Sequence, residues 1–413
     1  MYTTLLSGAI LGLSAVSSAY PSGSASAHDA ANTGSPGAYN SSSYTAGSDI
    51  SNTTSSSTSQ FPPPFPNVAP DSAAETRIEQ AALGTLPSGN AKPPPPSPDS
   101  LISLGFIAFN ELFEVAFFTE LIANISASAP GYTAVPDREA VLRVLKVVQA
   151  QEELHELNAN GAFEAFTGHV IKPCRYDFPV ETFMDAIRLA STFTDVVLST
   201  LPEIQTIFAL QNDTGLIRGV GSVIGQEGEQ NGFYHQILGE VPSQLPFLTG
   251  GARDFAFNAI LQNFVVPGSC PNLELLLASH NNGVGLRTLD TLTVNTSPDQ
   301  FSIQEDIKAS FSASTANVGL GNIFNAHTQQ GSGLYLTYIN QQNAPFSVPV
   351  KEMTSDAGPL QFTASFPGKT NFLNGLTIAA VTRSDFTGKM MSPDDVASDA
   401  LFGPALIEVN QDI

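Results

Sequence analysis

The sequence contains no tryptophan and only two cysteines, and charged residues make up only 13% of it. Without tryptophan, the chain cannot offer an exposed indole platform for stacking on sugar rings. Two cysteines are too few for a zinc site built from a cysteine cluster. Basic residues are also scarce, with 16 Lys and Arg against 38 Asp and Glu and a net charge of −22. This balance excludes the basic footprint that nucleic acid needs, and anionic lipid should repel the chain.

Several catalytic motifs are missing as well. No glycine-rich phosphate loop follows a strand-like segment, and no nucleophile elbow is present. Beyond the N-terminal segment no stretch is typical of a membrane span, because the most apolar one carries glutamates. We therefore expect neither nucleic acid nor membrane as a partner.

The first nineteen residues indicate export. Residues 1–19 contain a short apolar core, and Ser17 and Ala19 form a small-x-small cleavage pattern, which is typical of a secretory signal peptide although it lacks a basic n-region. In an oxidising compartment the two cysteines, Cys174 and Cys270, should form one disulfide bond that clamps two inter-helix loops.

Secretion also explains a surface with few charges. Ser, Thr, Asn and Gln, together with attached sugar, would keep such a surface soluble. Five N-x-S/T sequons predict glycosylation sites, at Asn40, Asn52, Asn124, Asn212 and Asn295. Residues 20–96 are dominated by Ser, Thr, Gly, Pro and Ala, and we expect them to be disordered. A spacer across a cell wall and a plain linker both fit this composition.

Residues 97–280 have the periodicity of helices. Ser97, Pro98 and Asp99 form a helix start, with a capping hydroxyl, proline in the first turn and an acid behind it. Long helices are predicted over about 97–126, 137–167, 180–211 and 214–238, and a shorter one over 253–264. Short to medium loops between long helices predict an antiparallel four-helix bundle. The fourth helix is rich in glycine, which indicates either close approach of a neighbouring backbone or a broken helix.

Residues 283–413 change to a period of two. Seven candidate strands separated by turn residues, from about 288 to 409, predict a small β-sandwich-like C-terminal domain. The fold class is therefore α+β. This domain either packs against the bundle or contacts a partner, and the sequence favours neither.

The first two helices carry carboxylates in apolar surroundings. Glu111 and Glu114 lie about 60° apart on one helical stripe, and phenylalanines surround them. On the second helix, Glu152 and His155 form a Glu-x-x-His pair whose side chains can reach one divalent ion. A buried carboxylate is costly unless it is paired, protonated or bound to metal. Together these residues form the half-site arrangement of di-iron and di-manganese bundles.

Residues 110–118, NELFEVAFF, followed by Glu152-x-x-His155, resemble the ferritin-like superfamily. More narrowly, the chain resembles secreted ferritin-like proteins, which include plant desiccation-related proteins and fungal stress-response and late-sexual-development proteins. The likeness covers about residues 101–277. It implies a ferritin-like bundle and a location outside the cell, with association with the cell wall as a further expectation.

The resemblance implies a second half-site on the third and fourth helices. The third helix offers Asp195 where a glutamate is expected, and this side chain is one methylene shorter. The fourth helix offers Glu227-x-x-Gln230, with glutamine in place of histidine, as also occurs on the last bundle helix of ferritins. His235 is too far along the axis from Glu227 to share one ion, and we interpret it as a core or surface histidine.

Two main functions remain open. The first is a non-enzymatic scaffold of fungal stress response or sexual development with a degenerate di-metal site. The second is a di-iron or di-manganese oxidase or peroxide-scavenging enzyme, with iron or manganese as cofactor. A wall-associated module whose β-region binds polysaccharide is a third. We expect a monomer or small oligomer, because glycans and appended segments would obstruct a ferritin-type cage.

Overall fold

A computed structural model describes residues 60–88, 94–314, 333–354 and 359–413 of the chain. The predicted signal peptide (residues 1–19) and the sequons at Asn40 and Asn52 lie outside the described residues. Among the other sequons, Asn212 and Asn295 are exposed, whereas Asn124 is half-buried in the last turns of a helix.

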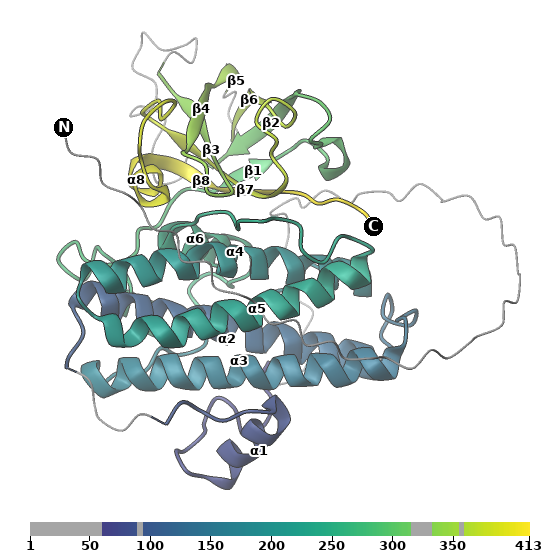
Figure 1. The fold of residues 1–413 in the computed structure, drawn as a ribbon, viewed down its shortest axis with the longest axis vertical. Coiled ribbons are helices and arrows are strands. Elements are labelled where there is room, and N and C mark those ends of the chain that lie inside the picture. The colour runs from purple at the N-terminus through teal and green to yellow at the C-terminus, as the bar shows by residue number, and fades with distance from the viewer. Residues whose placement is uncertain (1–59, 89–93, 315–332, 355–358) are drawn as a thin grey trace, which may run out of the picture. The chain divides into compact units, whose positions relative to one another are not determined.

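Four of the described helices are long and pack side by side (Figure 1). They are α2 (Pro98–Ala127), α3 (Arg138–Thr167), α4 (Phe183–Leu210) and α5 (Ile217–Leu238). The bounds agree with the predicted helices to within about one turn. Side-chain caps explain two of the starts, because the Ser97 hydroxyl accepts from the backbone of Ser100 and the Thr182 hydroxyl accepts from that of Asp185.

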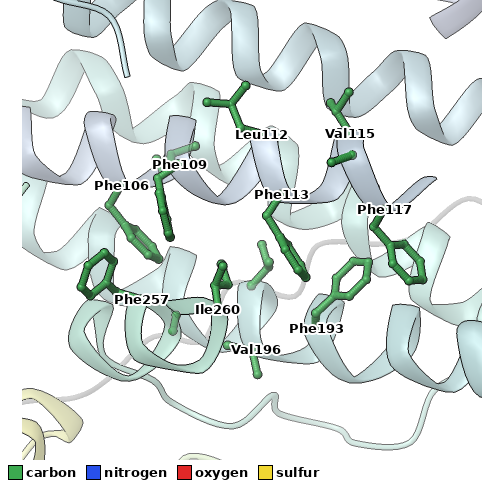
Figure 2. Close-up of a cluster of buried hydrophobic side chains, with 14 of the residues drawn as sticks. Phe106, Phe109, Leu112, Phe113, Val115, Phe117, Phe193, Val196, Phe257 and Ile260 are labelled. Atoms are coloured by element: carbon green, nitrogen blue, oxygen red, sulfur yellow. The ribbon is translucent and has the colours of Figure 1, made fainter. Parts of the chain in front are cut away.

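Helix α2 is the centre of the bundle's core. Its phenylalanines meet rings from other helices, as with Phe113 and Phe193 on α4, whose centroids are 5.3 Å apart. Figure 2 shows this cluster, in which Phe109 also lies against Phe257 of the short helix α6 (Arg253–Asn263). Of the described helices, α2 alone is long and apolar enough to cross a membrane by length and composition, but it is buried within the protein. Its burial explains its apolar character without a membrane.

The disulfide bond between Cys174 and Cys270 is present, which confirms the predicted pairing. Cys174 lies in the connection between α3 and α4, and Cys270 follows the short helix α6 (Arg253–Asn263). A backbone hydrogen bond from Val266 to the carbonyl of Arg175 joins the same two segments. The disulfide bond therefore links two connecting segments whose cysteines are 96 residues apart in the sequence.

One helix occurs where we expected disorder. Helix α1 (Ala73–Ala82) lies inside the Ser/Pro-rich segment 20–96 and packs against α3. Its Ile78 and Ala82 are buried, and its N-terminus is capped by Ser72. The composition of the whole segment obscures this short amphipathic stretch, which gains its stability from the bundle surface rather than from its own core.

Most of the glycines in α5 do not lie where a neighbouring backbone comes close to the helix. A Cβ atom at Gly219, Gly225 or Gly228 would meet no atom within 4 Å, and only Gly221 and Gly232 have neighbours at that range. The helix is nonetheless continuous from Ile217 to Leu238. Contacts of the helix with its neighbours therefore stabilise it despite its low propensity.

The C-terminal strands form two antiparallel four-stranded sheets within the described residues. The first has the order β1 (Leu292–Val294), β2 (Ile307–Ala313), β6 (Leu360–Phe366), β5 (Lys351–Thr354). The second has the order β4 (Phe346–Pro349), β3 (Tyr335–Asn340), β7 (Gly375–Thr382), β8 (Ala400–Val409), and helix α8 (Pro393–Asp399) precedes β8. A shared core joins both sheets, with Phe311 and Phe362 from one and Tyr338 and Phe402 from the other. The mixed fold class is thus confirmed.

The second sheet is joined to the helical region. Strand β7 is buried along its whole length, and its Leu376 and Ile378 belong to the same core cluster as the helices. The Thr249 hydroxyl, in the loop between α5 and α6, donates to the carbonyl of Leu376. Residues 283–413 therefore contribute one face to the core that the helices build.

Candidate metal centre

Four side chains from three helices converge inside the bundle. They are Glu111 of α2, Glu152 and His155 of α3, and Glu227 of α5. The spacing of three residues places Glu152 and His155 on one face of α3, and the packing of α2 and α5 brings a carboxylate from each to that face. The three carboxylates are fully or almost fully buried, and the His155 side chain is 15% exposed.

The imidazole of His155 lies among the three carboxylates. Its Nδ1 is 2.9 Å from Glu152 Oε2 and 3.7 Å from both Glu111 Oε2 and Glu227 Oε1. One ligand atom from each of the four residues lies within 4.8 Å of the others. Three oxygens and one nitrogen at this spacing are a donor set that suits iron and manganese.

The carboxylates are poorly compensated by the protein itself. Both oxygens of Glu111 and both of Glu227 have no hydrogen-bond partner among the described residues. A buried acceptor without a partner costs roughly 1–3 kcal/mol, and more if it is charged. Such orphaned oxygens beside a histidine fit a site that binds a cation.

Burial and mutual repulsion change how these groups titrate. Burial raises the pKa of Glu111 to about 7, although the nearby imidazole of His155 acts in the opposite direction. Burial, followed by the charges of Glu152, Glu114 and Glu111, raises the pKa of Glu227 well above its usual range. Burial alone would lower the pKa of His155, but Glu152 and Glu111 raise it well above that of a free imidazole. The cluster therefore retains protons wherever no cation replaces them.

Gln230 lies next to this cluster. Its amide donates to Glu152 Oε1 at 2.6 Å, and the Tyr234 hydroxyl donates to its carbonyl oxygen at 3.3 Å. Glutamine at this position therefore orients a carboxylate by hydrogen bonding. In the half-site that the resemblance implies, a histidine stands at this position, and it would offer a nitrogen ligand instead of an amide.

Glu114 is buried beside the group of four but is not one of them. The Asn110 amide, one turn away on α2, donates to it at 2.7 Å. Burial and the charges of Glu152 and Glu111 raise the pKa of Glu114 well above its ordinary value. Its surroundings favour a protonated, hydrogen-bonded acid, and Asn110 is the partner that the sequence analysis did not single out.

Asp195 faces a different part of the interior. Its Oδ1 accepts from the Asn231 amide at 2.9 Å, and its Oδ2 lies 3.8 Å from Nε2 of His235. Its neighbour Thr194, not Asp195, is fully buried. The sequence analysis missed the pairing of Asp195 with His235, because no spacing within one helix reveals which residues of α4 and α5 meet.

No protein-family model matches this chain, and no curated protein sequence matches it either.

Proposed function

We propose that this protein is a secreted, glycosylated, ferritin-like protein that holds one transition-metal ion in its bundle and serves as a non-enzymatic scaffold in fungal stress response or development. The observation that carries the metal site is the convergence of Glu111, Glu152, His155 and Glu227 within 4.8 Å, with four carboxylate oxygens lacking a hydrogen-bond partner. The disulfide bond supports the extracellular location, because such bonds persist in oxidising compartments.

The arrangement favours one ion over two. A second half-site would need an acid from α4, but Asp195 is hydrogen-bonded to Asn231 and faces His235. It would also need a second nitrogen ligand, and Gln230 instead donates its amide to Glu152. This neutral amide donor occupies one oxygen of Glu152, so fewer carboxylate oxygens remain free for a second metal.

Iron or manganese held by these four residues would supply a Lewis acid and a redox-active centre. The protein's own residues define the surroundings: the amide of Gln230 orients Glu152, and in the metal-free chain Nδ1 of His155 lies 2.9 Å from the same carboxylate. A cavity of about 10 Å³ borders Glu111 and Asn110, which is room for about one water molecule. So small a space beside Glu111 has no room for a bulky substrate, which supports storage or structural binding.

The decisive test is the metal content of the purified full-length chain, measured by elemental analysis after expression with iron and manganese. We expect about one ion per chain, and we expect the double substitution Glu152→Ala with His155→Ala to abolish it while the helical circular-dichroism signal remains. Glu153→Gln is the matched control, since Glu153 is a buried neighbour on α3 outside the group of four. Metal retained by the double variant would refute the ligand assignment.

A two-metal oxidase is the alternative. Two ions per chain, together with consumption of oxygen or peroxide that Asp195→Ala abolishes, would establish this function and refute the one-ion scaffold.

A further inference from the structure

A second polar site lies away from the group of four, at a cavity of about 160 Å³. Helices α4 and α5, the loop that follows α5, the start of β7 and the segment after β8 line it. Its frame is fixed by hydrogen bonds between distant segments: Val241 donates its backbone amide to the carbonyl of Gln411, and Asn374 donates its side-chain amide to that of Gln244. The walls of the cavity are therefore held in place by hydrogen bonds between these segments.

Polar atoms without partners face this cavity. His235 is 3% exposed and lines it, and its Nδ1 lies 3.1 Å from the Pro242 carbonyl, which can only accept. Nδ1 must therefore carry a proton, while Nε2 has no hydrogen-bond partner. Asn410 also lines the cavity, and its Oδ1 has no partner although its amide donates to Glu240.

One carboxylate lines this cavity, and a second acidic residue lies close to it. Asp195 lines the cavity, and both oxygens of Glu408 on β8 are buried without a partner. Burial first, and then the charges of Asp195 and Glu240, raise the pKa of Glu408 well above its usual range. Glu408 therefore holds a proton, so the carboxylate of Asp195 supplies the negative charge of the lining, and the unpartnered atoms of His235 and Asn410 are acceptors. The missing group is a hydrogen-bond donor with positive charge.

The size and walls of the cavity favour a molecule over a bare ion. Among the described residues, only the group around His155 brings metal-ligating atoms of three or more residues within 4.8 Å, so the acids here are too spread out to share one ion. Leu198, Leu245 and Leu248 form an apolar wall opposite the polar groups. A cavity of about 150 Å³ accommodates a benzene-sized molecule, so there is room for a ligand with a short hydrocarbon chain.

We propose that this cavity binds a small aliphatic primary amine in its protonated form, with the ammonium group at Asp195 and Asn410 and the hydrocarbon chain against the leucines. This site is distinct from the metal centre and does not depend on it.

The test compares three probes of similar shape and different charge, namely n-butylammonium, n-butanol and butyrate, by calorimetric titration of the full-length chain at neutral pH. We expect saturable binding of n-butylammonium in the millimolar range, as suits so small a ligand, and weaker binding of the alcohol and the acid. Asp195→Asn should weaken binding roughly tenfold or more, because it removes a charge-assisted hydrogen bond.

A second pair of variants protects the test against misfolding. A Cβ atom at Gly228 would meet no atom within 4 Å, and Gly228 lines the cavity, so Gly228→Leu should fill the space and abolish binding. Gly225→Leu is the matched control, because Gly225 is equally open but does not line the cavity, and it should bind normally. Equal binding of butanol and butylammonium, preference for butyrate, unchanged affinity in Gly228→Leu, or no binding of any probe would overturn the proposal.

Discussion

Individual buried acids determine how the interior of this bundle behaves. Glu227 is the clearest case, since its carboxyl is completely buried and neither oxygen has a hydrogen-bond partner among the described residues. Its presence lowers the stability of the metal-free protein, and this cost is consistent with a role in binding.

Glu227→Met replaces this carboxyl with an apolar side chain of similar size. We expect the free energy of unfolding of the metal-free protein to rise by about 1–3 kcal/mol and metal binding to be lost. Chemical denaturation in the presence of a chelator measures the first effect, and elemental analysis measures the second. Glu156→Met is the control: the Glu156 carboxyl accepts from Asn160 at 2.6 Å, so its loss should not stabilise the fold. A destabilised Glu227→Met variant that still holds metal would contradict the assignment.

The candidate metal site could be predicted in part from single residues. The spacing of Glu152 and His155 and the apolar surroundings of Glu111 indicate three of the four residues that the structure brings together. The fourth, Glu227, comes from the Glu227-x-x-Gln230 pattern that the resemblance implies. The orientation of Asp195 could not be predicted, because it depends on how α4 is rotated against α5. Local periodicity describes one helix face, whereas the contact between two faces depends on packing over the whole interface.

At the scale of elements, the helices were the most predictable part of the fold. Their apolar repeats indicate where they run, and the capping residue Ser97 marks the start of α2. Helix α1 was missed because a short helix with only two buried residues carries a weak signal inside a Ser/Pro-rich segment. The strands alternate clearly, but their arrangement into two sheets depends on contacts that are distant in sequence.

Helix α5 should gain stability from substitution of its open glycines. Gly225→Ala places a methyl group where no atom lies within 4 Å, so we expect the free energy of unfolding to rise by about 0.5–1 kcal/mol through better helix propensity. Urea denaturation measures the change. Gly221→Ala is the comparison, since its Cβ would lie 2.8 Å from Gln205 Nε2 and the gain should shrink or vanish. A loss of stability at Gly225 would show that this glycine has a role that the structure does not explain.

The disulfide bond should contribute strongly to stability, because it closes a long loop between the α3–α4 connection and the segment after α6. Replacing Cys174 and Cys270 with serine should lower the free energy of unfolding by about 2–5 kcal/mol. Thermal and chemical denaturation of the double variant measure this loss, and the wild-type chain treated with a reductant should show the same loss. Unchanged stability in both would mean that the bond is unimportant for the fold.

At the scale of the molecule, the buried acids predict a pH dependence of stability. Burial raises the pKa values of Glu111 and Glu153 to about 7 and that of Glu156 to about 8. The folded metal-free chain therefore binds more protons than the unfolded chain between the ordinary glutamate pKa and these values. Its stability is greatest at acidic pH and falls as pH rises through about 7 to 8.

Denaturation of the chelator-treated protein at a series of pH values from about 5 to about 8 checks this expectation. Glu153→Gln should flatten the dependence, because it removes one of the groups with a raised pKa. Metal affinity should change in the opposite direction and increase with pH, since the ligands must lose protons before they bind. Stability that rises over this range in the metal-free protein would contradict the protonation states inferred for the interior.

Helix α2 has a consequence for the fate of the whole chain. It is 30 residues long and almost entirely covered by the rest of the protein. An unfolded molecule therefore exposes a long hydrophobic segment that water solvates poorly. Lipid tails or another unfolded copy of the chain would bury this segment equally well. Native packing keeps this segment from associating with other molecules. Unfolding of the bundle should therefore lead to aggregation faster than to refolding.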